Sequence, residues 1–397
     1  MWSRERRSTT PVSIDENLLK TPAEPPAAVI EAIATGNPES FKSQSEAAGE
    51  VAALFGADSP HSARIPRLYA KTRIDRRHMA VNPLTEDFDR SASIRPRMDN
   101  FLKHAGPLAV DVASRALSGA GIVSPENEIG LLVMVTSTGF IAPGVDVAVM
   151  KGCGLSDSVG RVVINFMGCA AAMNGLRTAS DFACAHPESK ALVVCVELSS
   201  VNGVFKPDIN DVVISSLFGD GCAAIVVGST HSASQQQQQQ QQQPTLAPGK
   251  IIIRKCFSKL VRGTEEGIIL GVNADGITCE LSPKLPNYIN AGVGPVLDEI
   301  LAANGLTKAD IDLWAIHPGG PKIIEESLKS LQLPDEVAAI SWEMLSRYGN
   351  MLSVSLPFVL KRMAAEAKEK RPVSTGVAFS FGPGITVEGI LFEVVGN

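Results

Sequence analysis

Short runs of apolar and β-branched residues alternate along the chain with longer segments in which apolar residues recur at helical spacing. The short runs are typical of buried strands, and the longer segments are typical of helices that pack on one face. The longest helix is predicted over residues 94–119, with Gly119 and Gly121 as its stop signal. Strands are predicted at residues 27–34, 129–135, 191–196 and 311–316. This alternation predicts an α/β layered fold.

Residues 162–173, Val-Val-Ile-Asn-Phe-Met-Gly-Cys-Ala-Ala-Ala-Met, combine a strand pattern with a reactive residue type. The pattern predicts a strand that ends at Gly168 and a helix that begins at Ala170. Cys169 would then lie at a helix N-terminus, where backbone N–H groups and the helix dipole favour a thiolate, the nucleophilic form. On this stretch alone, the alternative is a buried cysteine that serves as a small hydrophobe.

The second half of the chain repeats the order of elements in the first half. The strand before His317 matches the strand before Ser137, and the turn at Gly349-Asn350, which we expect to open an apolar helix, matches the turn at Gly168-Cys169. A predicted helix at 295–305 matches residues 110–121, and a glycine turn with a strand at 379–392 matches residues 217–227. Ser137 and Cys169 are 32 positions apart, and His317 and Asn350 are 33 apart. We therefore predict an internal duplication.

The predicted organisation has four parts. Residues 1–26 form a flexible N-terminal arm, 27–233 a first half with the nucleophilic cysteine, 234–249 a glutamine-rich loop, and 250–397 a second half with the catalytic histidine and asparagine. The arm has no apolar segment of the kind found in secretory signals, although an organelle transit peptide remains open. Nine consecutive glutamines at 235–243 form a low-complexity tract that cannot build a packed core.

Composition narrows the classes of protein to consider. The 397 residues are 45% hydrophobic, which is enough for a large core, and the net charge of −6 gives no support to a nucleic-acid partner. No apolar run reaches the length of a membrane span, so no membrane partner is expected. The seven cysteines are scattered without a CxxC pair, which favours neither zinc nor a disulfide framework and fits a reducing, cytoplasmic compartment.

The duplication places three chemically useful side chains together. If the halves are related by a pseudo-twofold, Cys169 and Asn350 occupy equivalent turns, and His317 lies at the end of a neighbouring strand. A histidine can hold a cysteine as thiolate, and imidazole and amide N–H groups can donate to a carbonyl oxygen as negative charge develops. We therefore predict acyl transfer through a thioester. Each residue alone has a structural alternative, such as a helix cap for the asparagine.

A basic segment lies near the start of the first half. Arg64, Arg67 and Lys71 are spaced three and four apart, so on a helix they would share one face. Such a face could hold the phosphates of an anionic substrate. The alternative is a solvated charged face, and Pro66 leaves the position of Arg64 relative to the helix open.

Four motifs resemble those of one known family. They are Gly-Cys-Ala-Ala-Ala at 168–172, Trp-Ala-Ile-His-Pro-Gly-Gly-Pro at 314–321, Tyr-Gly-Asn-Met at 348–351 and Phe-Gly-Pro-Gly-Ile-Thr-Val-Glu at 381–388. In this order they resemble the type III polyketide synthases, the chalcone synthase-like family of the thiolase superfamily. The resemblance covers nearly all the chain from about residue 27 to residue 393 and leaves out the arm and the glutamine tract.

The resemblance implies a duplicated, five-layered αβαβα thiolase-like fold that acts as a homodimer. Cys169 would carry the growing chain, while His317 and Asn350 would stabilise the enolate formed from malonyl-CoA and the oxyanion at the thioester carbonyl. Arg64, Arg67 and Lys71 would hold the phosphates of CoA, and Phe218 would be the gatekeeper between the CoA tunnel and the cavity. The substrates would be malonyl-CoA and an acyl-CoA (or malonyl or acetyl) starter, with no metal or redox cofactor. The substrate pocket would include Ser137, Thr138, Ser199, Asn202, Gly271, Cys279, Leu352 and Phe381.

Several pocket positions differ from those of plant chalcone synthases. Ala142 stands where many plant members have a methionine that crosses to the partner subunit, and Ile214 stands where glycine is frequent. Cys279 replaces a phenylalanine, and Leu352 replaces a serine near Asn350. These differences leave the starter and the number of extensions open, and the product could be a phloroglucinol, a resorcinol or a pyrone. A ketoacyl-carrier-protein synthase of fatty-acid initiation is the alternative enzyme, and a non-catalytic scaffold is a third alternative.

Overall fold

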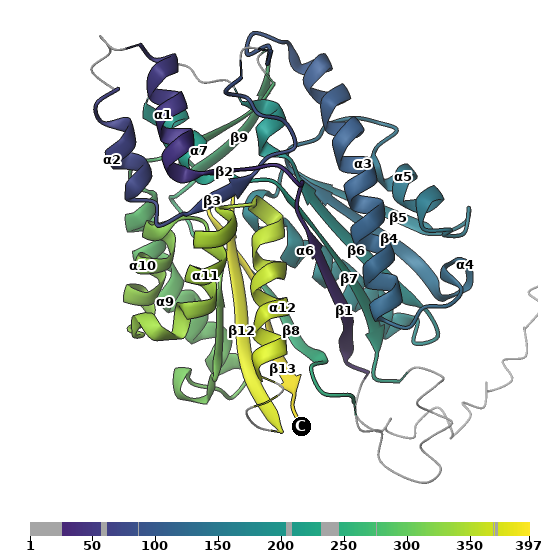
Figure 1. Ribbon diagram of the computed structural model, residues 1–397. Helices are drawn as coiled ribbons and strands as arrows, with labels where there is room; N and C mark the ends of the chain where they lie inside the picture. Colours follow the sequence, from purple (N-terminus) through teal and green to yellow (C-terminus); the bar gives the residue numbers. More distant parts are fainter. Residues whose placement is uncertain are drawn as a thin grey trace, which may run out of the picture.

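The computed structural model describes residues 26–56, 62–85, 87–203, 209–231, 246–274, 276–367, 369 and 372–397. Nearly all of the predicted arm at 1–26 and the glutamine tract at 235–243 lie outside these residues, so their predicted behaviour stays a prediction. The described chain forms a central sheet that is flanked by helices (Figure 1).

Nine strands form one hydrogen-bonded sheet in the order β11-β12-β13-β8-β1-β7-β6-β4-β5. Two smaller sheets pair β9 with β10 and β2 with β3. The strands are β1 (Ala28–Gly36), β2 (Phe41–Ser43), β3 (Arg76–His78), β4 (Ile129–Thr136), β5 (Gly160–Asn165), β6 (Lys190–Glu197), β7 (Gly221–Ser229), β8 (Ile251–Leu260), β9 (Ile268–Asn273), β10 (Gly276–Leu281), β11 (Leu313–Ile316), β12 (Val373–Gly382) and β13 (Thr386–Val395).

The pairing directions repeat between the two halves of the sheet. In the first half β4 and β6 are parallel, and β6–β7 and β7–β1 are antiparallel. In the second half β11 and β12 are parallel, and β12–β13 and β13–β8 are antiparallel. The halves meet where β1 pairs with β8, from Ala28 opposite Ile253 to Ile30 opposite Ile251. This repetition is the pattern expected of a duplicated unit.

The α-helices are α1 (Gln44–Leu54), α2 (Ile65–Ala70), α3 (Ile94–Gly119), α4 (Pro125–Glu128), α5 (Val145–Gly152), α6 (Ala171–Ala185), α7 (Ile209–Leu217), α9 (Leu285–Ala303), α10 (Pro321–Leu331), α11 (Ala339–Tyr348) and α12 (Ser355–Ala367). The helix predicted at residues 94–119 is therefore confirmed at both ends.

Strand side chains alternate between two apolar layers. On β4, Leu132 and Met134 pack with α3, whereas Val133 and Val135 pack with α6. Successive side chains of a strand point to opposite faces, so each half of the sheet is covered on both sides. In the second half, α9 and α10 cover the outer face, where Trp314 and Ile316 of β11 are buried.

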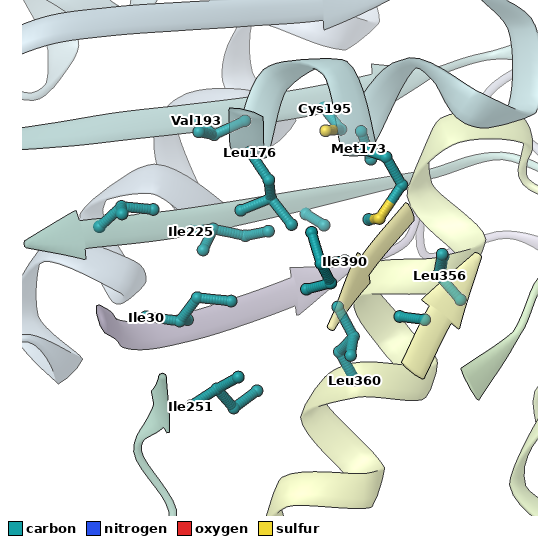
Figure 2. Close-up of a cluster of buried hydrophobic side chains, with 14 of the residues drawn as sticks. Ile30, Met173, Leu176, Val193, Cys195, Ile225, Ile251, Leu356, Leu360 and Ile390 are labelled. Atoms are coloured by element: carbon teal, nitrogen blue, oxygen red, sulfur yellow. The ribbon is translucent and has the colours of Figure 1, made fainter. Parts of the chain in front are cut away.

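Helices α6 and α12 form the layer between the two halves. Figure 2 shows Met173 and Leu176 of α6 and Leu356 and Leu360 of α12 in one apolar cluster with Ile390 of β13. The layers therefore run from the outer helices through one half-sheet to α6 and α12, then through the other half-sheet to α9 and α10. The predicted duplicated αβαβα fold is confirmed.

Some predicted boundaries were wrong. Strand β5 ends at Asn165 instead of Gly168, because Phe166 adopts a left-handed conformation (φ 57°). Asn350 does not open a helix: α12 begins at Ser355, after a turn in which Leu352 is also left-handed (φ 50°). Helix α9 begins at Leu285, well before the predicted 295, with a proline in its first turn.

Within the described ranges, no helix is both long enough and apolar enough to cross a membrane. In the same part of the chain, no three His, Cys, Asp or Glu side chains are grouped to hold a metal ion. All seven cysteines are described and are free thiols.

The burial of the central helix layer leads to a prediction about stability. Leu176 is fully buried in this layer, whereas Val123 is 91% exposed. We expect Leu176→Ala to lower the free energy of unfolding by about 2–5 kcal/mol, because it removes buried methyl groups and leaves a cavity. Val123→Ala should change it by less than about 0.5 kcal/mol. Denaturant midpoints at unchanged slope measure both effects, and equal effects would contradict the assigned layer.

Candidate active site

Cys169 lies in a 3-10 turn (Gly168–Ala170) that leads directly into α6. Both halves of the chain hold its backbone. The Gly168 N–H donates to Ser137 Oγ at 3.1 Å, and Ser380 Oγ donates to the Cys169 carbonyl at 2.8 Å. The position predicted from sequence, at the start of a helix, is therefore the observed one.

Asn350 faces Cys169 from the second half. Its Oδ1 accepts a hydrogen bond from Leu352 N–H at 2.9 Å, which sets the orientation of the amide. Its Nδ2 therefore points toward Cys169, 3.7 Å from Sγ, and donates to the Gly319 carbonyl at 3.2 Å. The amide is an oriented donor beside the thiol.

His317 follows β11 and is 1% exposed. Its backbone N–H donates to Phe379 O at 3.1 Å. Within the described residues, neither ring nitrogen has a hydrogen-bond partner. Burial lowers the pKa of His317 to about 3, so the imidazole is neutral at physiological pH and has one free donor and one free acceptor.

The electrostatics of Cys169 differ from the expected helix-terminal thiolate. Burial is the largest influence and raises the pKa of the Cys169 thiol, while its hydrogen bond with Asn350 lowers that pKa. The thiol is partly exposed because it lines a cavity, but protein atoms surround most of it and keep it away from bulk water. Desolvation therefore outweighs the dipole, and the free site contains a neutral thiol beside a neutral imidazole.

Two cavities meet at this site. A tunnel of about 890 Å³ is lined by Cys169, His317 and Asn350 together with Lys71 and Phe381. A smaller inner cavity of about 150 Å³ adjoins it. Four residues line both cavities: Phe218, Leu270, Cys279 and Leu352. Phe218 thus lies at the boundary, where a gatekeeper was predicted.

Most predicted pocket residues line one of these cavities. Ser137, Thr138, Ser199 and Asn202 line the inner cavity, as does Ile214. Gly271 lines neither cavity, although its neighbour Leu270 on β9 lines both. Gly271 pairs with Thr278 of β10, and Thr278 lines the inner cavity. Ala142 precedes a cis Ala142–Pro143 bond and lines a separate hollow with Phe140 and Val163.

The basic segment is only partly at the tunnel. Lys71 lines the tunnel, whereas Arg64 and Arg67 are exposed and do not line it. Helix α2 is only six residues long, so Arg64 is its N-cap residue and Lys71 its C-cap residue. Both cap residues keep a right-handed helical backbone, so the i, i+3, i+7 spacing still applies, and the predicted role of the three side chains in holding CoA phosphates stays a prediction.

Glu197 is a functional candidate that sequence reasoning missed. This fully buried carboxyl group accepts hydrogen bonds from Ser137 N (2.9 Å), Thr138 Oγ1 (2.8 Å) and Ser353 Oγ (2.6 Å). Burial raises its pKa to about 7. It links the inner-cavity wall to the turn after Asn350. Its position at the end of β6, next to Ser199, was the available signal.

The arrangement supports one kind of chemistry. A thiol beside a neutral imidazole and an oriented amide can accept an acyl group as a thioester. The imidazole and amide N–H groups can also donate to an oxygen that gains negative charge, and a mostly apolar surrounding strengthens such bonds.

Comparisons with known proteins agree with this geometry. Residues 16–231 match the family described as chalcone and stilbene synthases, N-terminal domain, and residues 253–396 match the corresponding C-terminal domain. The chain is 59% identical over 384 residues to the alpha-pyrone synthesis polyketide synthase-like Pks18 of Mycobacterium tuberculosis, which covers 95% of this chain and 94% of the relative.

Solved structures of polyketide synthases are also similar. PKS-I from the brown alga Ectocarpus siliculosus has a TM-score of 0.85 and 38% identity, over 94% of this chain and 100% of that one. The 1,3,6,8-tetrahydroxynaphthalene synthase of Streptomyces coelicolor has a TM-score of 0.81 and 25% identity, over 94% of this chain and 100% of that one.

The buried imidazole makes stability depend on pH. An unfolded histidine has a pKa of about 6.5. Since the folded pKa of His317 is about 3, its contribution is complete above pH 6.5 and is lost as pH falls. From pH 7 to pH 5 we expect the free energy of unfolding to fall by about 2 kcal/mol more in the native protein than in His317→Gln. Chemical denaturation of both proteins at the two pH values measures this difference.

The comparison of the native protein with His317→Gln has an internal control. Burial raises the pKa of Glu197 to about 7 and that of Asp220 to about 6, and both groups titrate in either protein. Their contributions therefore cancel in the difference. An equal decline in the two proteins would contradict a neutral, buried His317.

Proposed function

Because the chain belongs to the chalcone and stilbene synthase family, the type III polyketide synthases, we propose that it extends an acyl-CoA starter on Cys169 with malonyl-CoA and releases an α-pyrone. One observation supports this most directly. The neutral, buried His317 has no protein partner for its ring within the described residues, and it lines the same tunnel as Cys169 and Asn350.

Loading begins with the starter thioester in the tunnel. Cys169 Sγ attacks the carbonyl carbon, the bond from that carbon to the CoA sulfur breaks, and the thiol proton leaves with CoA. The unprotonated nitrogen of His317 can accept this proton and return it. Lys71, at the tunnel, is the residue best placed to hold a CoA phosphate, with Arg64 and Arg67 on the nearby surface.

Extension uses the same donors. When malonyl-CoA loses carbon dioxide, the electron pair moves onto the thioester as an enolate. The N–H groups of His317 and Asn350 donate to the enolate oxygen. A neutral imidazole suits this step, because an imidazolium would readily protonate the carbanion. The enolate carbon then attacks the acyl carbonyl, forms the new C–C bond and releases Cys169 as a thiolate. The extended chain, now a CoA thioester, is transferred back to Cys169 with release of CoA before the next extension or closure.

Two observations support an α-pyrone. The relative with 59% identity is named for alpha-pyrone synthesis. The inner cavity is also far smaller than the tunnel, about 150 Å³ against about 890 Å³, which favours few extensions. A short polyketide can close when its enol oxygen attacks the thioester carbonyl and displaces Cys169. The phloroglucinol and resorcinol products that the sequence left open need carbon–carbon closure instead.

The alternative of a ketoacyl-carrier-protein synthase loses its support. Both halves of the chain match domains of chalcone and stilbene synthases. A non-catalytic scaffold is also disfavoured, because the three reactive groups meet in one tunnel. A cytoplasmic location, expected from cysteine usage, stays a prediction.

A homodimer is the expected assembly, and β5 offers a site for it. This strand is at the edge of the nine-stranded sheet, where backbone groups are free to pair with another strand. Val163 on β5 is 52% exposed. Phe140 is 56% exposed, and its ring packs edge-on against Phe166, 5.7 Å between centroids. A second copy of the chain would cover this apolar edge next to the loop that carries Ser137.

Product analysis tests the central proposal. With malonyl-CoA and a panel of acyl-CoA starters, the protein should release CoA and form α-pyrones, which mass spectrometry identifies. Cys169→Ala should form no acyl-enzyme and no product, because no thiol remains to accept the starter. Condensation at the native rate by this variant would contradict the role of Cys169. Aromatic resorcinols or phloroglucinols as main products would contradict only the proposed ring closure through the enol oxygen.

The dimer has a separate test. Val163→Lys places a charge on the apolar edge and should convert a dimer into a monomer in light scattering during size-exclusion chromatography. Val123→Lys is the matched control, because Val123 is also exposed but lies outside β5. A native protein that is already monomeric, or a Val163→Lys variant that stays dimeric, would reject β5 as the interface.

A further inference from the structure

We propose that Gln44 and Arg77 are positioning residues that hold Phe218 and Asn350 in place for condensation and connect them to helix α2 at the tunnel. The inference rests on polyketide synthesis itself and not on the pyrone product. Neither residue was singled out by the sequence motifs, and both are buried, at 6% and 3% exposure.

Phe218 and Asn350 lie side by side, and their backbones pair in a short bridge that we call the joint. They form an isolated parallel bridge, in which Asn350 N–H donates to Leu217 O at 2.8 Å and Gly219 N–H donates to Asn350 O at 2.9 Å. The joint requires glycine on both sides. A Cβ at Gly219 would lie 2.5 Å from Tyr348 O, and one at Gly349 (φ 69°) would lie 2.7 Å from Leu217 O. A shift of the gatekeeper backbone therefore shifts the catalytic amide as well.

Arg77 packs directly on this joint. Its Nη1 donates to the Phe218 carbonyl at 2.8 Å. Its side-chain stem lies so close that a Cβ at Gly349 would be 2.9 Å from Arg77 Cγ. The carboxylate of Asp220 provides a nearby opposite charge. A buried guanidinium needs all of these partners, so its position is strongly constrained.

Gln44 connects Arg77 to the tunnel. Its Oε1 accepts from Arg77 Nε at 2.9 Å, and its Nε2 donates to Thr72 Oγ1 at 2.8 Å and to Ser216 O at 2.7 Å. Thr72 Oγ1 in turn donates to Tyr69 O of α2 at 2.7 Å, beside Lys71. A continuous set of buried hydrogen bonds thus runs from α2 through Gln44 and Arg77 to Phe218.

This network does not include the nucleophile. The hydrogen bonds that hold the backbone around Cys169 come from Ser137 and Ser380 and do not involve Gln44 or Arg77. Loading depends first on Cys169, whereas condensation also needs the Asn350 amide and the Phe218 side chain to be correctly positioned relative to Cys169. Since displacements of about 1 Å can cost about 100-fold in rate, a disturbed joint should affect condensation more than loading.

Two variants separate the parts of the network. Arg77→Lys keeps the positive charge but lacks the planar fork that reaches both Gln44 and Phe218. Gln44→Glu keeps an acceptor for Arg77 but removes the donors to Thr72 and Ser216. Arg76→Lys is the matched control: Arg76 is the neighbour on β3, and its guanidinium lies over the Phe41 ring instead of in the network.

The experiment measures two partial reactions of the full chain. Acyl loading from acyl-CoA is followed by intact-protein mass spectrometry, and condensation is followed by product formation from malonyl-CoA. We expect Arg77→Lys and Gln44→Glu to lower condensation by about tenfold more than loading and to release more shortened products, while Arg76→Lys behaves like the native protein.

Three results would overturn the proposal. Equal losses in both partial reactions, accompanied by a lower Tm, would show a merely structural role. Native rates in both variants would show no role. Native behaviour of Gln44→Glu with a defective Arg77→Lys would restrict the effect to Arg77 and reject the connection to α2. Native protein that loads but forms no polyketide would instead reject the proposed function.

Discussion

The burial of α6 and α12 between the two halves of the sheet is the constraint on which the structure depends. Leu176 and Leu360 are completely buried in this layer, and each buried side chain of this kind contributes about 1.5–3 kcal/mol through the apolar surface removed from water. Because the halves repeat the same topology, the turns before the two helices lie at corresponding places. Cys169 and Asn350 therefore meet as a consequence of how the core is packed, and the end of β11 adds His317.

The same burial determines the chemistry of the site. Desolvation raises the pKa of the Cys169 thiol and lowers that of His317 to about 3, so the resting pair is uncharged. A site without fixed charge is well suited to an enolate, because its donors stabilise negative charge on oxygen without offering an acidic proton to carbon. Asn350 contributes through orientation: the bond from Leu352 N–H turns its amide toward the sulfur.

Residues outside the site fix the relative positions of its parts. Glu197 joins the Ser137–Thr138 wall to Ser353, and the backbone bridge joins Phe218, between the two cavities, to Asn350. Each of these connections spans the two halves of the chain. The inner cavity beyond the gate is small, and Cys279 and Leu352 lie at its boundary with the tunnel.

The sequence by itself determined the fold class, the duplication and the three reactive residues, because apolar periodicity and matched glycine turns are local patterns that repeat at equal spacing. It placed Cys169 correctly at a helix start. It did not determine the protonation state of that cysteine, because desolvation depends on neighbours from distant segments. It included Gly271 among the pocket residues, although Gly271 lines neither cavity, and it did not show that the helix between Arg64 and Lys71 is only six residues long. Glu197, Gln44 and Arg77 were missed for the same reason: their partners lie 28 to 172 positions away in the chain, so only the tertiary structure shows what they bind.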